Sequence, residues 1–146
     1  MFFCVLNHLQ PERFDPDMLR NGYYKLGYSY FYNDTDRALA CYKSALRYIR
    51  HGSKYHYLDI NVDSLLKHPS QVLCNEGIDN APCYYIAYNL ACLYTRKKEY
   101  EKAWSWFELS LKMGYPHYDF LYIDSDIADL RNKNNSEFNF LIELYK

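Results

Sequence analysis

The chain has 146 residues, a formal net charge of −1 and a sequence pI near 6.5, which exclude a strongly basic nucleic-acid-binding protein. No apolar run approaches the roughly 18–20 residues needed to cross a bilayer, so a membrane-spanning protein is not expected either. Tyrosine is the unusual component of the composition, with 18 residues. A tyrosine can bury its ring and leave its hydroxyl in water, which suits both helix packing and binding surfaces.

Helix signals in the first half of the chain predict a pair of helices. Asp15-Pro16 offers an N-cap followed by proline at the first helical position, and this helix should run to about Tyr32. A second helix is expected over Asp36–His51, where Gly52 provides a left-handed stop. Its apolar residues recur with helical spacing at Ala38, Tyr42, Ala45 and Ile49.

The second half of the chain repeats these signals. Asn80-Ala81-Pro82 should open a helix that ends near Arg96. A partner helix is expected over Glu99–Met113, and Gly114 then provides its stop. The apolar face of this partner helix is marked by Ala103, Phe107 and Leu111.

A second shared element follows each helical pair. It begins Tyr57-Leu58-Asp59-Ile60 after the first pair and Tyr122-Ile123-Asp124-Ser125 after the second. We expect a short helix, a turn at the aspartate, another short helix and a final amphipathic helix. In the second copy Ser136 should cap that final helix, and its inward-facing residues should be Phe138, Leu141 and Ile142. No segment alternates convincingly with period two, so strands are not expected.

The two halves align as two copies of one unit, over residues 22–80 and 86–145. Aligned residues share their size and character: Tyr24 with Tyr88, Leu26 with Leu90, Tyr30 with Tyr94, Ala38 with Ala103, Tyr42 with Phe107, and Leu46 with Leu111. Repeats with helical spacing build stacked scaffolds, which usually bind other proteins rather than catalyse reactions. We therefore expect one domain, with a cap segment at 1–14, a first helical unit at 15–80 and a second at 81–146.

The sequence Tyr23-x-x-Leu26-Gly27-x-x-Tyr30, followed by Ala38-x-x-x-Tyr42, resembles the tetratricopeptide repeat (TPR). The second copy gives Ala87-x-x-Leu90-Ala91-x-x-Tyr94 and then Ala103-x-x-x-Phe107. The small residues of this pattern let the two helices of a pair approach closely. The resemblance, to bacterial TPR-containing proteins, implies an all-α fold of TPR-like helix-turn-helix repeats, an α-solenoid with two tandem units of about 65 residues.

In the TPR family the first helix of each pair lines a concave face. Aromatic side chains on that face would form a platform for an extended or helical peptide. The alternative is that the groove is filled internally, by the N-terminal segment or by the last helix. The candidate partner-binding residues are Tyr24, Tyr28, Phe31, Tyr85, Tyr88, Asn89, Cys92 and Thr95.

Two more specific sites are weighed against this general one. Asn89 stands where chaperone-binding TPR proteins hold a peptide carboxylate, but Tyr24 and Tyr28 replace the other residues of that clamp. The stretch Asp59-Ile60-Asn61-Val62-Asp63 begins like a calcium loop but has Ser64 where the sixth-position glycine should be. An aspartate before a short helix more simply caps that helix.

The five cysteines lack C-x-x-C spacing, and their odd number predicts free thiols in a reducing, cytoplasmic compartment. The first six residues are apolar without a basic n-region, so no secretory leader is expected. A zinc site or a Cys-His nucleophile would have to come from the middle of the chain. The residues available for it are His51, His56, His68, Cys74 and Cys83.

These patterns predict a non-catalytic adaptor or scaffold that binds a peptide or protein surface through the concave stripe, with no metal and no cofactor. An alternative is a small stoichiometric inhibitor, such as an immunity-type protein that blocks a toxin. A third alternative is a Cys- or metal-dependent hydrolase. Because terminal repeats need a polar outer face, an uncovered repeat end would favour a homodimer.

Overall fold

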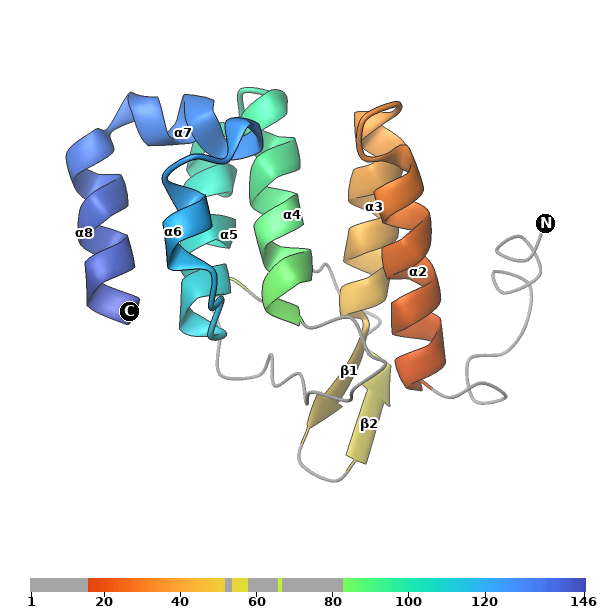
Figure 1. The fold of residues 1–146 in the computed structure, drawn as a ribbon. Coiled ribbons are helices and arrows are strands. Elements are labelled where there is room, and N and C mark those ends of the chain that lie inside the picture. Colours follow the sequence, from red (N-terminus) through yellow and green to blue (C-terminus); the bar gives the residue numbers. More distant parts are fainter. Residues whose placement is uncertain (1–15, 52–53, 58–65, 67–82) are drawn as a thin grey trace.

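A computed structural model of the protein describes residues 16–51, 54–57, 66 and 83–146, and within them the fold is mostly helical (Figure 1). No helix of this part of the chain has both the length and the apolar character that crossing a membrane requires. The elements are α2 (Pro16–Tyr30), α3 (Thr35–Leu46), β1 (Tyr48–His51), β2 (Lys54–Tyr57), α4 (Cys83–Arg96), α5 (Tyr100–Lys112), α6 (Tyr118–Leu121), the 3-10 turn η4 (Ser125–Ile127), α7 (Ala128–Lys133) and α8 (Asn135–Tyr145).

Two helical hairpins, α2 with α3 and α4 with α5, stand side by side through contacts between α3 and α4 (Figure 1). The predicted apolar faces are confirmed within the helices, where Ala38, Tyr42 and Phe107 are fully buried, but Ile49 lies in β1 and not on α3. A Cβ atom added at Gly27 would lie 3.0 Å from the ring of Tyr42. A small residue is therefore required where α2 crosses α3, as the sequence pattern indicated.

The predicted extension of the second helix to His51 is wrong, and so is the expectation that the chain forms no strands. Helix α3 ends at Leu46, and β1 pairs with β2 as an antiparallel hairpin in which Tyr48 faces Tyr57. Aromatic and β-branched residues favour strands, and in sequence only Gly52-Ser53 separates the two, which is typical of hairpins. The hairpin is joined to α2, because Arg20 Nη1 donates to the Tyr48 carbonyl at 2.7 Å and the rings of Tyr23 and Tyr48 stack.

The tail after α5 follows the predicted order of short helix, turn, short helix and final helix. Asp124 caps η4 by accepting from the backbone N–H of Asp126 at 3.0 Å. The N-cap of α8 is Asn134, which accepts from the backbone of Glu137, and not Ser136 as predicted. The expected inward-facing residues of α8 are buried, namely Phe138, Leu141 and Ile142.

Several expectations fall on residues outside the described part of the chain. They are the cap at 1–14, the helix start at Asp15, the stop at Gly52, the calcium-like stretch at 59–63, most of the first copy of the shared tail element and the helix opening at 80–82. The boundaries of the two units consequently stay predictions.

Two left-handed residues close the helices of the second hairpin. Gly114, at φ +95°, follows α5 as expected, and the N–H of Tyr115 bonds back to the Ser110 carbonyl at 3.1 Å. Lys98, at φ 62°, follows α4, and the N–H of Glu99 bonds back to the Tyr94 carbonyl at 2.9 Å. Both arrangements satisfy the carbonyls at the end of a helix, but only glycine adopts this backbone conformation without strain.

Opposite substitutions at these two positions should have opposite effects on stability. Gly114→Ala is expected to lower the free energy of unfolding by about 1 kcal/mol, and Lys98→Gly to leave it unchanged or raise it by up to about 1 kcal/mol. Urea unfolding followed by circular dichroism measures both. A destabilised Lys98→Gly variant would show that this turn is held by interactions of the lysine side chain rather than limited by backbone strain.

Candidate functional site

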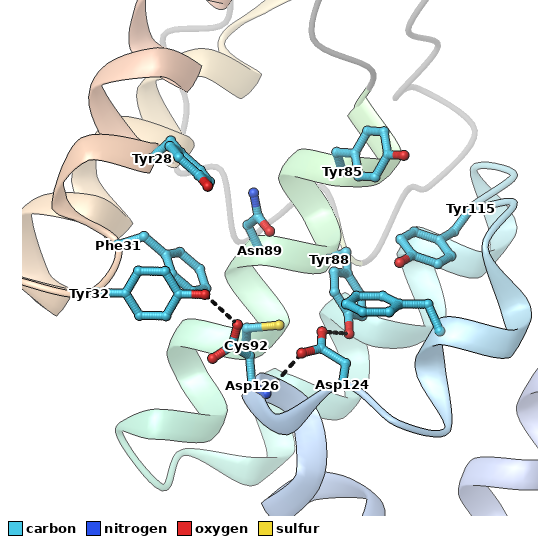
Figure 2. Close-up of a pocket in the computed structure, with 11 residues that line it drawn as sticks. Tyr28, Phe31, Tyr32, Tyr85, Tyr88, Asn89, Cys92, Tyr115, Asp124 and Asp126 are labelled. Carbon is cyan, nitrogen blue, oxygen red and sulfur yellow. Dashed lines mark hydrogen bonds between the residues drawn. The ribbon is translucent and has the colours of Figure 1, made fainter.

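A hollow of about 200 Å³ lies between α2, α4 and the segment that follows α5 (Figure 2). Helix α2 provides one wall, α4 the floor, and residues between α5 and α7 the opposite wall. The lining residues are Tyr28, Phe31, Tyr32, Tyr85, Tyr88, Asn89, Cys92, Tyr115, Phe120, Asp124 and Asp126.

Most of the candidate residues from the sequence line this one hollow. They are Tyr28, Phe31, Tyr85, Tyr88, Asn89 and Cys92. They meet because residues separated by three or four positions share one face of a helix, and α2 and α4 turn these faces toward the same space.

The remaining two candidate residues do not line it. The ring of Tyr24 packs edge-on against Tyr42 with centroids 5.8 Å apart, and Tyr42 in turn accepts from Asn89 Nδ2 at 3.3 Å. Thr95 is buried and donates its hydroxyl to the Ala91 carbonyl one turn earlier. The side chain of Thr95 therefore satisfies its own helix instead of facing the hollow.

Sequence reasoning missed five residues of the hollow, which are Tyr32, Tyr115, Phe120, Asp124 and Asp126. Tyr32 lies just beyond α2, and the others follow α5. For the aspartates the sequence indicated only a role as helix caps, and Asp124 does cap η4. Their position against α4 comes from the folding of the tail onto that helix.

The hollow has an exposed aromatic rim and a buried floor. Tyr28 is 64% exposed, Tyr32 69% and Phe120 47%. On the floor Tyr88 and Cys92 are almost completely buried. A molecule that entered would cover exposed rings first and then reach buried polar groups.

Hydrogen bonds join the tail to the floor on α4 and to the wall at the end of α2. Tyr88 donates its hydroxyl to Asp124 Oδ2 at 2.5 Å, and Tyr32 donates to Asp126 Oδ2 at 2.9 Å. Arg96 Nη2 lies 3.9 Å from Asp126 Oδ1, and Arg96 also donates to the carbonyl of Phe31. The tail therefore fills part of the space between α2 and α4, and the hollow is the part that it leaves open.

Three tyrosine hydroxyls and the thiol of the site are held in their protonated forms. The hydrogen bond to Asp126 raises the pKa of Tyr32 from 10.0 to about 12, and burial raises those of Tyr88 and Tyr115. Burial also raises the pKa of the Cys92 thiol well above its usual value. A protonated thiol is a weak nucleophile and a weak metal ligand. The described residues contain no group of three or more His, Cys, Asp or Glu side chains that could hold a metal ion.

The cysteines differ from the expectation of free thiols at one position. Cys41 and Cys92 are free and buried, but Cys83, at the start of α4, is disulfide-bonded.

Comparison of the chain with models of known protein families, with curated proteins and with solved structures gives no match. The resemblance to the TPR pattern consequently depends on the residues quoted above. The function has to be argued from the chemistry of the hollow itself.

Tyr88→Phe should destabilise the protein, because it leaves the buried carboxylate of Asp124 with one hydrogen-bond donor fewer. The expected loss in the free energy of unfolding is about 1–3 kcal/mol. Tyr28→Phe removes a hydroxyl from an exposed ring of the same hollow and should change it by less than about 0.5 kcal/mol. Equal losses in the two variants, measured by urea unfolding, would contradict a structural role for the Tyr88–Asp124 bond.

Stability should fall as the pH rises from about 10 to about 12. The pKa of Tyr32 is raised from 10.0 to about 12 in the folded protein, so the unfolded chain releases this proton first. The stabilising contribution is complete below pH 10.0 and disappears as the pH passes through about 12. Urea unfolding at several alkaline pH values tests this, and Tyr32→Phe should make the decline shallower. An unchanged decline in Tyr32→Phe would mean that other groups cause it.

Proposed function

We propose that this protein is a non-catalytic binding module that holds a peptide or protein surface at the hollow between α2 and α4. The observation that supports this is the exposed aromatic rim formed by Tyr28, Tyr32 and Phe120. Large exposed apolar groups that gather around a concave site are typical of interaction surfaces. Tyrosine is well suited to such contacts because its ring provides contact area while its hydroxyl bonds to water or to a partner.

A TPR-like arrangement of the two hairpins is part of the same proposal. The first helices of both hairpins, α2 and α4, contribute to the hollow, which is the arrangement that the family resemblance implies. The second helices carry the small and aromatic residues of the packing pattern, such as Ala38 on α3 and Ala103 on α5, both fully buried. The tail would then modify the concave side by covering part of it.

The state of Cys92 favours binding over catalysis at this site. A nucleophilic cysteine needs a lowered pKa, and burial raises the pKa of this thiol. One histidine, His117, contacts a lining residue in the described part of the chain: its Nε2 is hydrogen-bonded to the hydroxyl of Tyr85 at 2.5 Å. This histidine is engaged at the rim of the hollow and not with the thiol on its floor.

Panning of a random peptide library displayed on phage, with the full chain as bait, tests the proposed function. Peptides should be enriched, and Tyr28→Ala combined with Phe120→Ala should weaken their binding by at least about tenfold. Tyr24 and Tyr88 are unsuitable targets for this test, because both are engaged within the fold.

The matched control is Ile123→Ala. Ile123 is 75% exposed and lies in the same tail segment, but it does not line the hollow. This variant should bind the selected peptides as the unchanged protein does. Enrichment of no peptide, or equal binding by the double variant, would contradict the proposed function.

A further inference from the structure

The walls of the hollow indicate which kind of side chain it accepts, and this inference rests on the binding function proposed above. Aromatic rings approach the space from three sides, with Tyr28 on α2 and Phe31 just after it, Tyr85 and Tyr88 on α4, and Phe120 on α6 (Figure 2). The face of an aromatic ring carries a partial negative charge and attracts a cation that lies within about 6 Å of the ring centre.

The charged groups that line the hollow have one sign. They are the carboxylates of Asp124 and Asp126, and no lysine, arginine or histidine is among the lining residues. Asp126 has a cation nearby, in Arg96. Within the described part of the chain Asp124 forms no ion pair, and its oxygens accept from the hydroxyl of Tyr88 and from a backbone N–H.

In the described residues, the only arginine hydrogen-bonded to Asp124 is Arg131, and it bonds to the backbone carbonyl and not to the carboxylate. Arg131 Nη1 donates to the backbone carbonyl of Asp124 at 3.2 Å and to that of Leu121 at 2.8 Å. Asp124 as a whole residue is only 7% exposed, so water solvates its carboxylate poorly. A cation that approached from the hollow would therefore meet a carboxylate without a charge partner.

At the edge of the hollow, a cation of the protein itself is already held by aromatic rings and a carboxylate. The guanidinium of Arg96 lies 4.8 Å from the centre of the Phe31 ring and 5.6 Å from that of Tyr32. The same group lies 3.9 Å from Asp126. Two aromatic rings and one carboxylate thus hold the Arg96 cation beside the hollow. The hollow itself offers the same combination, with aromatic rings around the carboxylate of Asp124.

We infer that the hollow anchors a lysine or arginine side chain of a basic peptide, with its methylene groups against the rings and its cation directed to Asp124. The hollow has a volume of about 200 Å³, and a water molecule takes roughly 30 Å³, so the space holds a few waters or one long side chain. A partner would thus insert a single cationic residue while its backbone lies across the exposed rim.

Titration of the full chain with three small probes, followed by NMR, tests this. The probes are N-acetyl-lysine methylamide, N-acetyl-arginine methylamide and the uncharged N-acetyl-norleucine methylamide. The two cationic probes should shift the resonances of the lining residues and bind at least about tenfold more tightly than norleucine. The difference in affinity between the cationic probes and the norleucine probe should become smaller at high salt, because salt screens charge interactions.

Two variants identify the groups responsible. Asp124→Asn should weaken binding of the cationic probes about tenfold and leave norleucine binding unchanged. Because Asp124 also contributes to the fold, Tyr28→Leu is the second variant, as it keeps an apolar group at an exposed position but removes the ring. It should weaken the cationic probes about fivefold and retain norleucine. Ile123→Ala is again the control and should change neither.

The outcomes separate this inference from the function on which it rests. Norleucine binding as tightly as lysine would overturn the cation inference and leave an apolar anchor as the basis of peptide binding. Failure of both cationic probes to bind, or their binding unchanged in both Asp124→Asn and Tyr28→Leu, would overturn it as well. If the peptide library also produced no ligand that depends on Tyr28 and Phe120, the proposed function would fail with it.

Discussion

The burial of α4 is the constraint on which the rest of this structure depends. Ten residues of this helix are buried, and they include the consecutive residues Ile86, Ala87 and Tyr88, which point to different sides of the helix. A helix that is apolar on all sides must be covered on all sides. Helix α5 covers one side, α3 another, and η4 and α7 pack against it from the tail (Figure 1). The hollow is the place where that cover is incomplete.

The polar groups of α4 show how the tail is held in position. Burying a tyrosine hydroxyl or a carboxylate without a partner is costly, and the two together satisfy each other. Tyr88 on α4 and Asp124 in the tail form such a pair, and Tyr32 adds a solvent-exposed hydrogen bond to Asp126. The tail therefore serves both the stability of α4 and the shape of the hollow, and the same carboxylates that fasten it give the hollow its negative charge.

The first half of the chain contributes differently from the second. Its hairpin presents Tyr28 and Tyr32 as an exposed wall, whereas the second hairpin supplies the buried floor. The wall is anchored away from the hollow, where buried Arg20 joins α2 to the β1 backbone and pairs with Asp17 at 2.7 Å. A rigid, mostly buried floor beside exposed rings is an arrangement that can bind without large rearrangement of the fold.

The residues alone were sufficient to predict the helical hairpins, the stop at Gly114 and a shared stripe of candidate residues on α2 and α4, because these depend on spacing within single helices. They were not sufficient for the end of α3, where pairing of β1 with β2 replaced helical continuation. Nor could they place Tyr115, Phe120, Asp124 and Asp126 at the hollow. Those contacts join segments far apart in the chain, and only the packing of the tail on α4 decides which of its side chains meet the stripe.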